Sequence, residues 1–419
     1  MLRSVLSGGL AVALAVGMVQ AQSGSPSPGE LLKEPAVKAA IDAAKATEAQ
    51  TIADQIRFCE IPAPSFKEEV RGQELQRVFT QLGLQNVRVD KVGNVLGEYV
   101  GAAAHPHLVL AAHLDTVFPE GTDVKVTREG ALLKGPGIGD DCRGLAVMVA
   151  IIREMKKANV KTPGSITFVA NVGEEGLGDL RGVKELFKAT LKDQIDRFVS
   201  IDGTGVHVTN VAVGSHRYRV TFKGPGGHSF GAFGMANPMG AMGRAIAKIQ
   251  ELQVPKQPRT TFNVGRIGGG TSVNSIPFEG WMELDMRSSD PASLAAIDAS
   301  IQKAIDAAVN EENARWGKPG VISVVKELVG DRPAGSTPEN SAIVRSGLAA
   351  ATVLGFASGP PGEGSTDSNI PMSLGVPSIT IGGGGRGRDA HALTETFDTT
   401  DAWMGTQHAL LLTLALAQK

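Results

Sequence analysis

Residues 108–115 read Leu-Val-Leu-Ala-Ala-His-Leu-Asp, an apolar run that ends with a histidine and an aspartate two positions apart. The run predicts a buried β-strand. Because alternate side chains of a strand share a face, His113 and Asp115 point the same way, and the carboxylate can orient the imidazole toward a metal ion. The same pair is also common as a hydrogen-bonded structural pair, so the motif alone leaves both interpretations open.

Three further apolar runs are followed by polar residues of the same kind. They are 165–172 with Glu174-Glu175, 198–201 with Asp202, and 376–381 with four glycines and then His391. In open α/β sheets, ligands bind just outside the carboxyl ends of the strands, so these runs predict an α/β domain with a site at one sheet edge. Taken singly, the acidic doublet is typical of a solvated loop and Asp202 of a turn.

A further acid lies in a glycine-rich turn, residues 135–141, which reads Gly-Pro-Gly-Ile-Gly-Asp-Asp. The apolar residues that follow, between 145 and 152, have helical spacing, which places Asp140 near a helix start. Aspartate is a favoured N-cap residue, so a structural cap is the alternative to a metal ligand. Proximity does not separate Asp140 from Asp141.

The order of these residues resembles the M20 family of co-catalytic zinc peptidases: H-x-D, a G-x-x-D turn, E-E, an acid and a late histidine. The resemblance covers nearly the whole mature chain. It implies that His113 and Asp202 bind one metal ion, that Glu175 and His391 bind the other, and that Asp140, chosen over Asp141 by motif alignment, bridges the two. It also implies that Glu174 is the general base and that Asp115 orients His113.

The implied chemistry needs these residue types. Two divalent ions can lower the pKa of a shared water and polarise a scissile carbonyl. Imidazole and carboxylate are suitable ligands for zinc, and they also accept cobalt or manganese. An unligated glutamate beside a ligand can take the proton of the water and later give it to the leaving amine. We therefore expect two zinc ions as the cofactor.

The middle of the chain has a different pattern. The predicted elements are strand 218–223, helix 237–252, strand 260–267, strand 280–288, helix 291–314 and strand 320–328. This β-α-β-β-α-β order is that of a ferredoxin-like module. Because it separates His391 from the other candidate ligands, we expect an inserted lid domain. The expected boundaries are a signal peptide at 1–21, a flexible leader at 22–34, a catalytic domain at 35–213 and 330–419, and the lid at 214–329.

M20 enzymes carry such a lid, which commonly pairs two subunits and brings a histidine toward the metals of the partner. The resemblance implies a homodimer through the lid, with His228 in the oxyanion-stabilising role, and Asn274 and Arg287 as residues that bind the polar end of the substrate. The alternatives are a glycine-turn residue for His228 and a cross-strand ion pair for Arg287. Gly383 and Gly384 are predicted to offer N–H groups to a substrate carboxylate, or else to form a tight turn.

The first residues predict an exported protein. Arg3 is followed by an apolar stretch and then by Val19-Gln20-Ala21, a pattern that fits a secretory signal peptide with cleavage after Ala21. The alternative is a retained membrane anchor, but the apolar core is shorter than the roughly 20 residues that a spanning helix needs. We therefore expect a periplasmic or secreted location, with no membrane association after cleavage.

Composition limits the partners and the architecture. The 419 residues, of which 42% are hydrophobic, suggest two domains, and a net charge of -2 without a basic run argues against a nucleic-acid partner. Two cysteines, Cys59 and Cys142, are too few for a disulfide scaffold, although they could pair in an oxidising compartment.

The type of substrate is inferred from Asp202. In M20 enzymes this position tends to be aspartate in aminopeptidases and dipeptidases, and glutamate in carboxypeptidases and deacylases. We therefore expect an exported metallopeptidase of aminopeptidase or dipeptidase type that acts on short peptides. One alternative is an M20 carboxypeptidase or N-acyl-amino-acid amidohydrolase. An alternative of another class is a non-catalytic exported peptide-binding protein, although the presence of Glu174 argues against it.

Overall fold

The structure, a computed structural model, describes residues 26–317 and 321–418. The predicted signal peptide at 1–21 lies outside these residues. Within the predicted leader at 22–34, residues Pro28–Leu31 form the short helix α1, which begins with a capping box between Ser27 and Glu30. Leu31 is buried, so this part of the segment is packed on the domain instead of forming a flexible leader.

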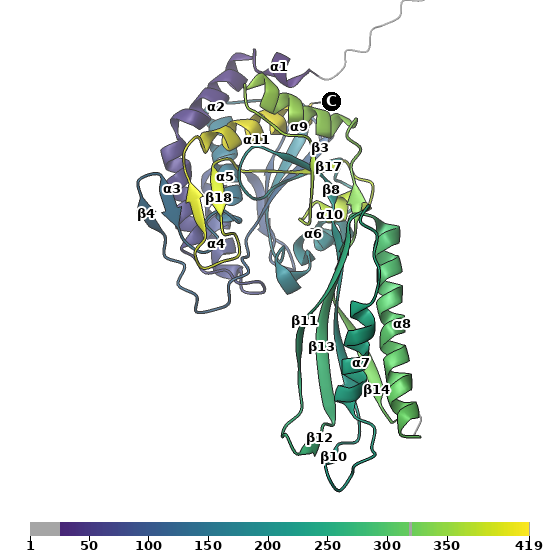
Figure 1. The fold of residues 1–419 in the computed structure, drawn as a ribbon. Helices are drawn as coiled ribbons and strands as arrows, with labels where there is room; N and C mark the ends of the chain where they lie inside the picture. The colour runs from purple at the N-terminus through teal and green to yellow at the C-terminus, as the bar shows by residue number, and fades with distance from the viewer. Residues whose placement is uncertain (1–25, 318–320, 419) are drawn as a thin grey trace, which may run out of the picture.

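A mixed sheet forms the centre of the larger domain (Figure 1). Its strands, in spatial order, are β1 (Gln85–Val89), β2 (Val95–Tyr99), β6 (Ser165–Asn171), β3 (His107–His113), β7 (Arg197–Ile201), β17 (Ser378–Ile381), β8 (Val208–Ala212) and β15 (Gly335–Ser336), and β16 (Gly362–Gly364) pairs with β8. Neighbouring strands β6, β3, β7 and β17 run parallel. Their carboxyl ends therefore meet at one edge of the sheet, where the polar residues of the sequence motifs follow them.

Helices cover both faces of this sheet. The residues of β3 alternate between two apolar clusters, with Leu108 and Leu110 in the larger one and Val109 and Ala111 in the smaller one. Residues of α2 (Pro35–Ala46), α4 (Glu69–Gln81), α5 (Cys142–Lys157), α9 (Ala342–Val353) and α11 (Trp403–Leu416) contribute to the larger cluster, and residues of α6 (Arg181–Glu185) to the smaller one. This double-sided burial explains why the strands read as continuous apolar runs.

The inserted lid extends away from the catalytic domain (Figure 1). Its antiparallel sheet has the order β11 (Thr260–Gly269), β13 (Glu279–Ser288), β9 (Gly214–Lys223) and β14 (Ser323–Arg332). Helices α7 (Pro238–Gln250) and α8 (Pro291–Arg315) cover one face and share its apolar core. Each helix begins with proline after a capping side chain, from Asn237 and Asp290. The predicted α/β fold with a β-α-β-β-α-β insertion is confirmed.

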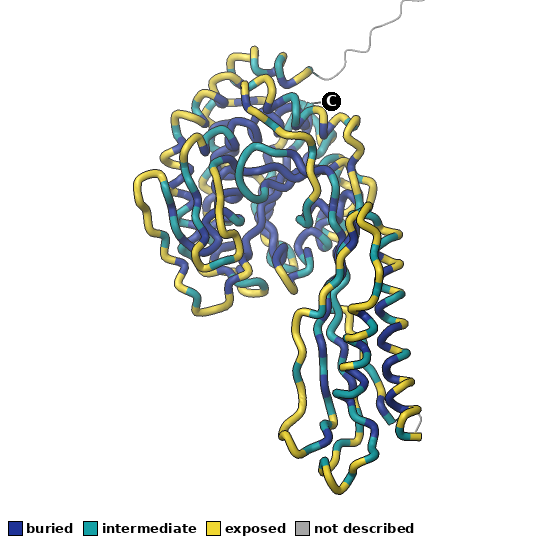
Figure 2. The backbone as a smooth tube through the Cα atoms, viewed as in Figure 1, coloured by how far each residue is buried: buried dark blue, intermediate teal, exposed yellow. Residues whose placement is uncertain are grey.

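Smaller elements complete the chain. A second antiparallel sheet of the catalytic domain has the order β18 (Arg386–Arg388), β19 (Thr396–Asp398), β5 (Leu132–Lys134) and β4 (Thr127–Glu129). At the far end of the lid, β10 (Gly227–His228) pairs with β12 (Ser275–Ile276), in a region with much exposed surface (Figure 2). Helices α3 (Glu48–Cys59) and α10 (Asn369–Ser373) also belong to the catalytic domain.

Two further features concern compartment and redox state. Among the described residues, no helix combines the length and the apolar content needed to cross a bilayer. Cys59 and Cys142 are free thiols, and both are buried in one apolar cluster between α3 and the start of α5.

Candidate metal centre

The fold brings the predicted ligands together at the carboxyl edge of the central sheet. His113 is the last residue of β3, the Glu174-Glu175 pair follows β6, and Asp202 follows β7. Asp140 comes from the glycine-rich turn that leads into α5, a helix that packs beside these strands. The convergence follows from the parallel arrangement, because each strand delivers its next residues to the same edge.

Asp140 stands between two groups of possible ligands. His113, Asp140 and Asp202 form one group, and Asp140, Glu175 and His391 form another; within each group the ligand atoms lie within 4.8 Å of one another. Oδ1 of Asp140 is 3.0 Å from Nε2 of His113, whereas Oδ2 is 3.1 Å from Nε2 of His391. The two oxygens of one carboxylate thus face different histidines, which is the arrangement that a bridging ligand needs.

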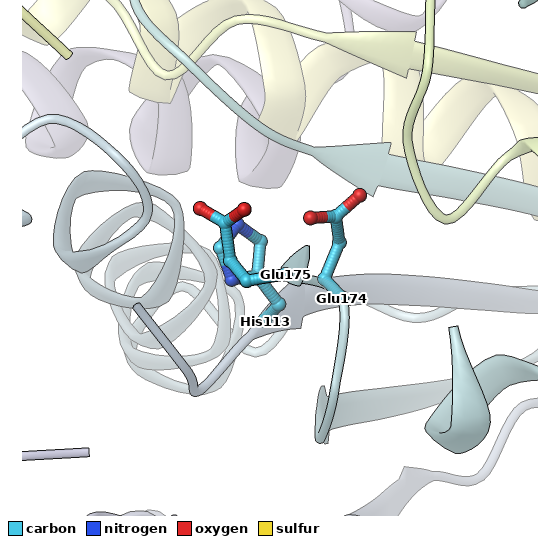
Figure 3. A group of neighbouring side chains, drawn as sticks. All are labelled: His113, Glu174 and Glu175. Atoms are coloured by element: carbon cyan, nitrogen blue, oxygen red, sulfur yellow. The ribbon is translucent and has the colours of Figure 1, made fainter. Parts of the chain in front are cut away.

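Glu174 and Glu175 enter the centre from the same loop. Oε1 of Glu175 lies 3.0 Å from Nε2 of His391. His113, Glu174 and Glu175 form a third close group, and Figure 3 shows their side chains side by side. Glu174 belongs to neither of the groups that share Asp140, although the third group includes it as a possible ligand beside His113 and Glu175.

The buried carboxylates of the site favour bound cations. Burial and the neighbouring Asp140 carboxylate together raise the pKa of Asp202 to about 7. Hydrogen bonds to Asp140 and Glu175 raise the pKa of His391 to about 10. Burying several carboxylates together is unfavourable unless positive charge compensates them. Two divalent ions would supply that charge, and the imidazole and carboxylate donors suit zinc, so the residues fit the implied metal pair.

The adjacent residues Asp140 and Asp141 have different contacts. Asp141 is the N-cap of α5: Oδ1 accepts a hydrogen bond from the N–H of Gly144, and Oδ2 accepts one from the N–H of His113. Its carboxylate is therefore committed to backbone groups of two elements. Asp140 faces the histidines instead. Proximity in the sequence could not separate these two acids. In the structure Asp141 caps the helix, and Asp140 is the candidate metal ligand.

Asp115 supports the site in a way that differs in detail from the expectation. Its carboxylate oxygens accept hydrogen bonds from the N–H groups of Glu174 and Glu175, at 2.9 and 3.0 Å, and from the hydroxyl of Ser65. Nδ1 of His113 is 3.0 Å from the backbone carbonyl of Asp115 and 3.6 Å from its carboxylate. Asp115 thus fixes the imidazole mainly through its carbonyl, and fixes the glutamate loop through its carboxylate.

Glu395 is a buried residue of the site that the sequence analysis missed. Its carboxylate accepts hydrogen bonds from the N–H groups of Gly137, Gly139 and Asp140, at 2.8, 2.8 and 3.2 Å. Burial raises its pKa to about 7. Because Glu395 follows His391 by four residues, it ties the loop of one candidate ligand to the turn that carries another. The four-residue spacing between His391 and Glu395 was the one feature of the sequence that could have pointed to Glu395.

Arg332, the last residue of β14, was also missed. It is buried, and its Nη1 lies 3.0 Å from Oε1 of Glu174 and 3.3 Å from the hydroxyl of Ser365. Its Nη2 donates to the backbone carbonyl of Glu174. Arg332 ends β14, the lid strand that leads back to the catalytic domain. This position at the end of a strand was the only feature of the sequence that could have pointed to it.

A cleft of about 320 Å³ opens in front of these residues. Besides the candidate ligands Asp140, Glu175, Asp202 and His391, its walls include Glu174, Arg217, Arg287, Arg332, Ser365 and Thr366. Nε of Arg287 donates to Asp285 at 2.9 Å, and Nε of Arg217 donates to the other oxygen of the same carboxylate at 3.0 Å. The structure therefore places Arg287 in the cleft, and its ion pair with Asp285 lies within β13, whereas the cross-strand ion pair to Asp285 comes from Arg217 of β9.

His228 and Asn274 are not brought to this cleft within one chain. They lie in and beside the β10–β12 pair, at the lid end far from the catalytic domain (Figure 1). The N–H of Ser229 donates to the carbonyl of Asn274 at 3.0 Å. The N–H groups of Phe230 and Gly231 donate to Nδ1 of His228, which leaves its Nε2 free of these turn contacts.

Gly383 and Gly384 do not line the cleft either. Both are buried, and their N–H groups donate to the carbonyls of Gly203 and Gly205, at 3.0 and 2.9 Å. A side chain on Gly384 would approach the carbonyl of Ala402 to 2.2 Å. These N–H groups are therefore not available to a substrate carboxylate, and the glycines allow close backbone packing instead.

Comparison with known proteins is consistent with this geometry. The model of peptidase family M20/M25/M40 matches residues 109–416. The uncharacterized protein YqjE of Bacillus subtilis is 27% identical over 326 residues, which are 73% of this chain and 82% of that protein. Succinyl-diaminopimelate desuccinylase of Corynebacterium glutamicum is 24% identical over 340 residues, covering 78% and 86%.

Solved structures share the fold. A tripeptidase from Staphylococcus aureus superimposes with a TM-score of 0.72 at 23% identity, over 88% of this chain and 98% of that one. At this identity the likeness concerns the fold of the catalytic domain and the lid.

Proposed function

We propose, from the premise that this chain belongs to peptidase family M20/M25/M40, that it is an exported dizinc dipeptidase. Family membership makes the protein a hydrolase of peptide bonds. The observation that carries the finer proposal is Asp140, whose two oxygens face the two histidines of separate ligand groups, with Glu174 outside both of these groups. Export is proposed from the signal-peptide pattern of residues 1–21.

The residues have distinct proposed roles. His113 and Asp202 would hold one zinc ion, Glu175 and His391 the other, and Asp140 both. When bound, the ions lower the pKa of a water and polarise the scissile carbonyl. Glu174 accepts the proton of the attacking water and returns it to the leaving amine. Arg332 holds the Glu174 carboxylate in place.

The proposed preference for a free dipeptide is based on two residues, one for the amino end and one for the carboxylate end of the substrate. Asp202 favours the aminopeptidase and dipeptidase branch, as argued from the sequence. Arg287 supports a substrate with a carboxylate close to the scissile bond, because its guanidinium lines the cleft and is oriented by Asp285. Arginine binds carboxylates with paired hydrogen bonds. A dipeptide presents an amino group and a carboxylate within one small molecule.

A homodimer would complete the site. His228 carries its hydrogen bonds from backbone N–H groups on Nδ1, so in the neutral ring Nε2 bears the proton and can donate to an oxyanion. The lid also carries exposed apolar side chains, which include Phe230, Phe233, Ile267, Val273 and Phe278. Exposed apolar patches commonly mark interfaces. We propose that the lid end of one subunit reaches the cleft of its partner.

The proposal is tested with purified, zinc-loaded protein and four substrates: Ala-Ala, Ala-Ala-Ala, N-acetyl-Ala and N-acetyl-Ala-Ala. We expect fastest release of alanine from Ala-Ala, and a loss of at least about 100-fold in kcat for Glu174→Gln with zinc content unchanged. Preference for the N-acetyl substrates would replace the dipeptidase by the second candidate, a carboxypeptidase or N-acyl-amino-acid amidohydrolase, which Arg287 would serve equally well. Turnover that survives Glu174→Gln would overturn the assignment of the base.

A further inference from the structure

A second, smaller compartment adjoins the cleft of the metal centre. It encloses about 220 Å³ and is lined by Val213, Arg259, Thr261, Arg287, Ser289 and Glu363. Arg287 lines both the cleft and the compartment, so the two spaces meet at this residue. None of the proposed metal ligands lines it.

The lid sheet builds this compartment from one face of two strands. Thr261 of β11 is the register partner of Arg287 of β13. Because side chains alternate along a strand, Arg259 and Thr261 share a face on one strand, and Arg287 and Ser289 share it on the other. This face is opposite to the buried residues that contact α7 and α8. Glu363, from β16 of the catalytic domain, also lines the compartment.

The charges of the compartment favour an anion. Arg259 is exposed and has no ion pair or hydrogen bond within the part of the chain that the structure describes. Arg287 uses its Nε for Asp285, and no hydrogen bond of its terminal nitrogens is found among the described residues. The compartment is thus lined by two guanidinium groups, two hydroxyls and the carboxylate of Glu363. Guanidinium and hydroxyl groups together supply the donors that a carboxylate needs.

We propose that this compartment is a binding subsite for a second carboxylate of the substrate, carried by the side chain of the residue on the C-terminal side of the scissile bond. The inference rests on the proposed function and narrows its substrate class to peptides that end in glutamate or aspartate. Arg287 holds the terminal carboxylate at the boundary of the two spaces. Arg259 holds the side-chain carboxylate beyond it, and Thr261 and Ser289 donate hydrogen bonds.

The test compares Ala-Glu with Ala-Gln, which have nearly the same shape and differ in one charge, using zinc-loaded full-length enzyme. We expect kcat/KM for Ala-Glu to exceed that for Ala-Gln by about tenfold, the scale of one charge-assisted hydrogen bond. Arg259→Gln should bring this ratio to about one while turnover of Ala-Gln is unchanged. Arg266→Gln, which removes an exposed arginine farther along β11, is the matched control and should leave the ratio as in the wild type.

A third variant gives the opposite effect. Glu363→Gln removes the carboxylate that competes for Arg259, so the ratio of Ala-Glu to Ala-Gln should rise above that of the wild type. Equal cleavage of the two peptides by the wild type, or an unchanged ratio in Arg259→Gln, would overturn the subsite. Failure to cleave either peptide would instead overturn the proposed dipeptidase function, so the two failures are distinguishable.

Discussion

Arg332 and Glu174 form a buried ion pair, with Nη1 of the arginine 3.0 Å from Oε1 of the glutamate. The arginine belongs to the last strand of the lid and the glutamate to the loop after β6, so the pair joins the two domains at the candidate base. Burial raises the pKa of Glu174, and the charge of Arg332 opposes this rise. The arginine thereby favours the ionised form that can accept a proton.

Replacing Arg332 tests this role. Arg332→Gln should lower kcat by about 100-fold, because the base loses both its position and its compensating charge. Since removal of the cation raises the pKa of Glu174, the acidic limb of the kcat profile should move to higher pH. Arg332→Lys should restore part of the rate and of the profile. An acidic limb that stays at the wild-type pH would show that Arg332 is structural. Zinc content, which should not change, is the control.

Glu395 should control metal affinity without binding metal. Glu395→Gln removes the charge that holds the N–H groups of Gly137, Gly139 and Asp140, so we expect zinc affinity to fall by about 10–100-fold. Competition with a chromophoric chelator measures this change. Glu327→Gln, an exposed position of the lid, is the control and should bind as the wild type does. Unchanged affinity in Glu395→Gln would contradict the role.

Subunit exchange should restore activity to two inactive variants. His228→Ala keeps an intact metal centre but cannot serve the partner, whereas Glu174→Gln keeps His228 but lacks the base. In a co-expressed mixture, about half of the dimers combine one chain of each kind, and each has one complete site, so activity should recover to about a quarter of the wild type. Activity no higher than that of the separate variants would exclude a site shared between subunits, as would full activity of His228→Ala alone.

His408 should make the fold sensitive to acid. It is fully buried in α11, with Nε2 2.9 Å from the carbonyl of Gly347, and burial lowers its pKa to about 4. Its unfolded value is near 6.5, so the unfolded state binds the proton first as the pH falls, and stability is lost between pH 6.5 and 4. Between pH 8 and 5 this group should cost about 2 kcal/mol of unfolding free energy.

Urea titrations of metal-free protein at the two pH values measure this loss. His408→Gln, which keeps an N–H donor, should lose about 2 kcal/mol less than the wild type over this range. His105→Gln changes an exposed histidine and should follow the wild type. The same pH dependence in all three proteins would contradict the assignment to His408.

The parts of the site that could be predicted from the sequence share a local signal. His113, Glu174 and Asp202 each follow a short apolar run, and a run that is buried on both faces of a parallel sheet delivers its next residues to one edge. Their meeting therefore follows from the fold class, together with the family resemblance. The lid could be predicted for a similar reason, because its strand and helix periods differ clearly along residues 218–328.

The parts that could not be predicted depend on contacts between distant segments. Glu395 bonds to N–H groups more than 250 residues earlier, and Arg332 reaches Glu174 across the domain boundary. The only local signals were the four-residue spacing of Glu395 from His391 and the position of Arg332 at a strand end, and neither signal names the contact partner. Gly383 and Gly384 were predicted to bind the substrate, and this prediction was wrong. The glycine run suggested free N–H groups, but these groups donate to the carbonyls of Gly203 and Gly205, which follow a different strand.

The central claim is that Asp140 bridges two metal ions, and anomalous diffraction at the zinc absorption edge tests it most directly. Crystals of the zinc-loaded protein should show two peaks, roughly 3.5–4 Å apart, on opposite sides of the Asp140 carboxylate. One peak should lie beside His113 and Asp202, and the other beside Glu175 and His391. A single peak, or two peaks that do not share Asp140, would contradict the account.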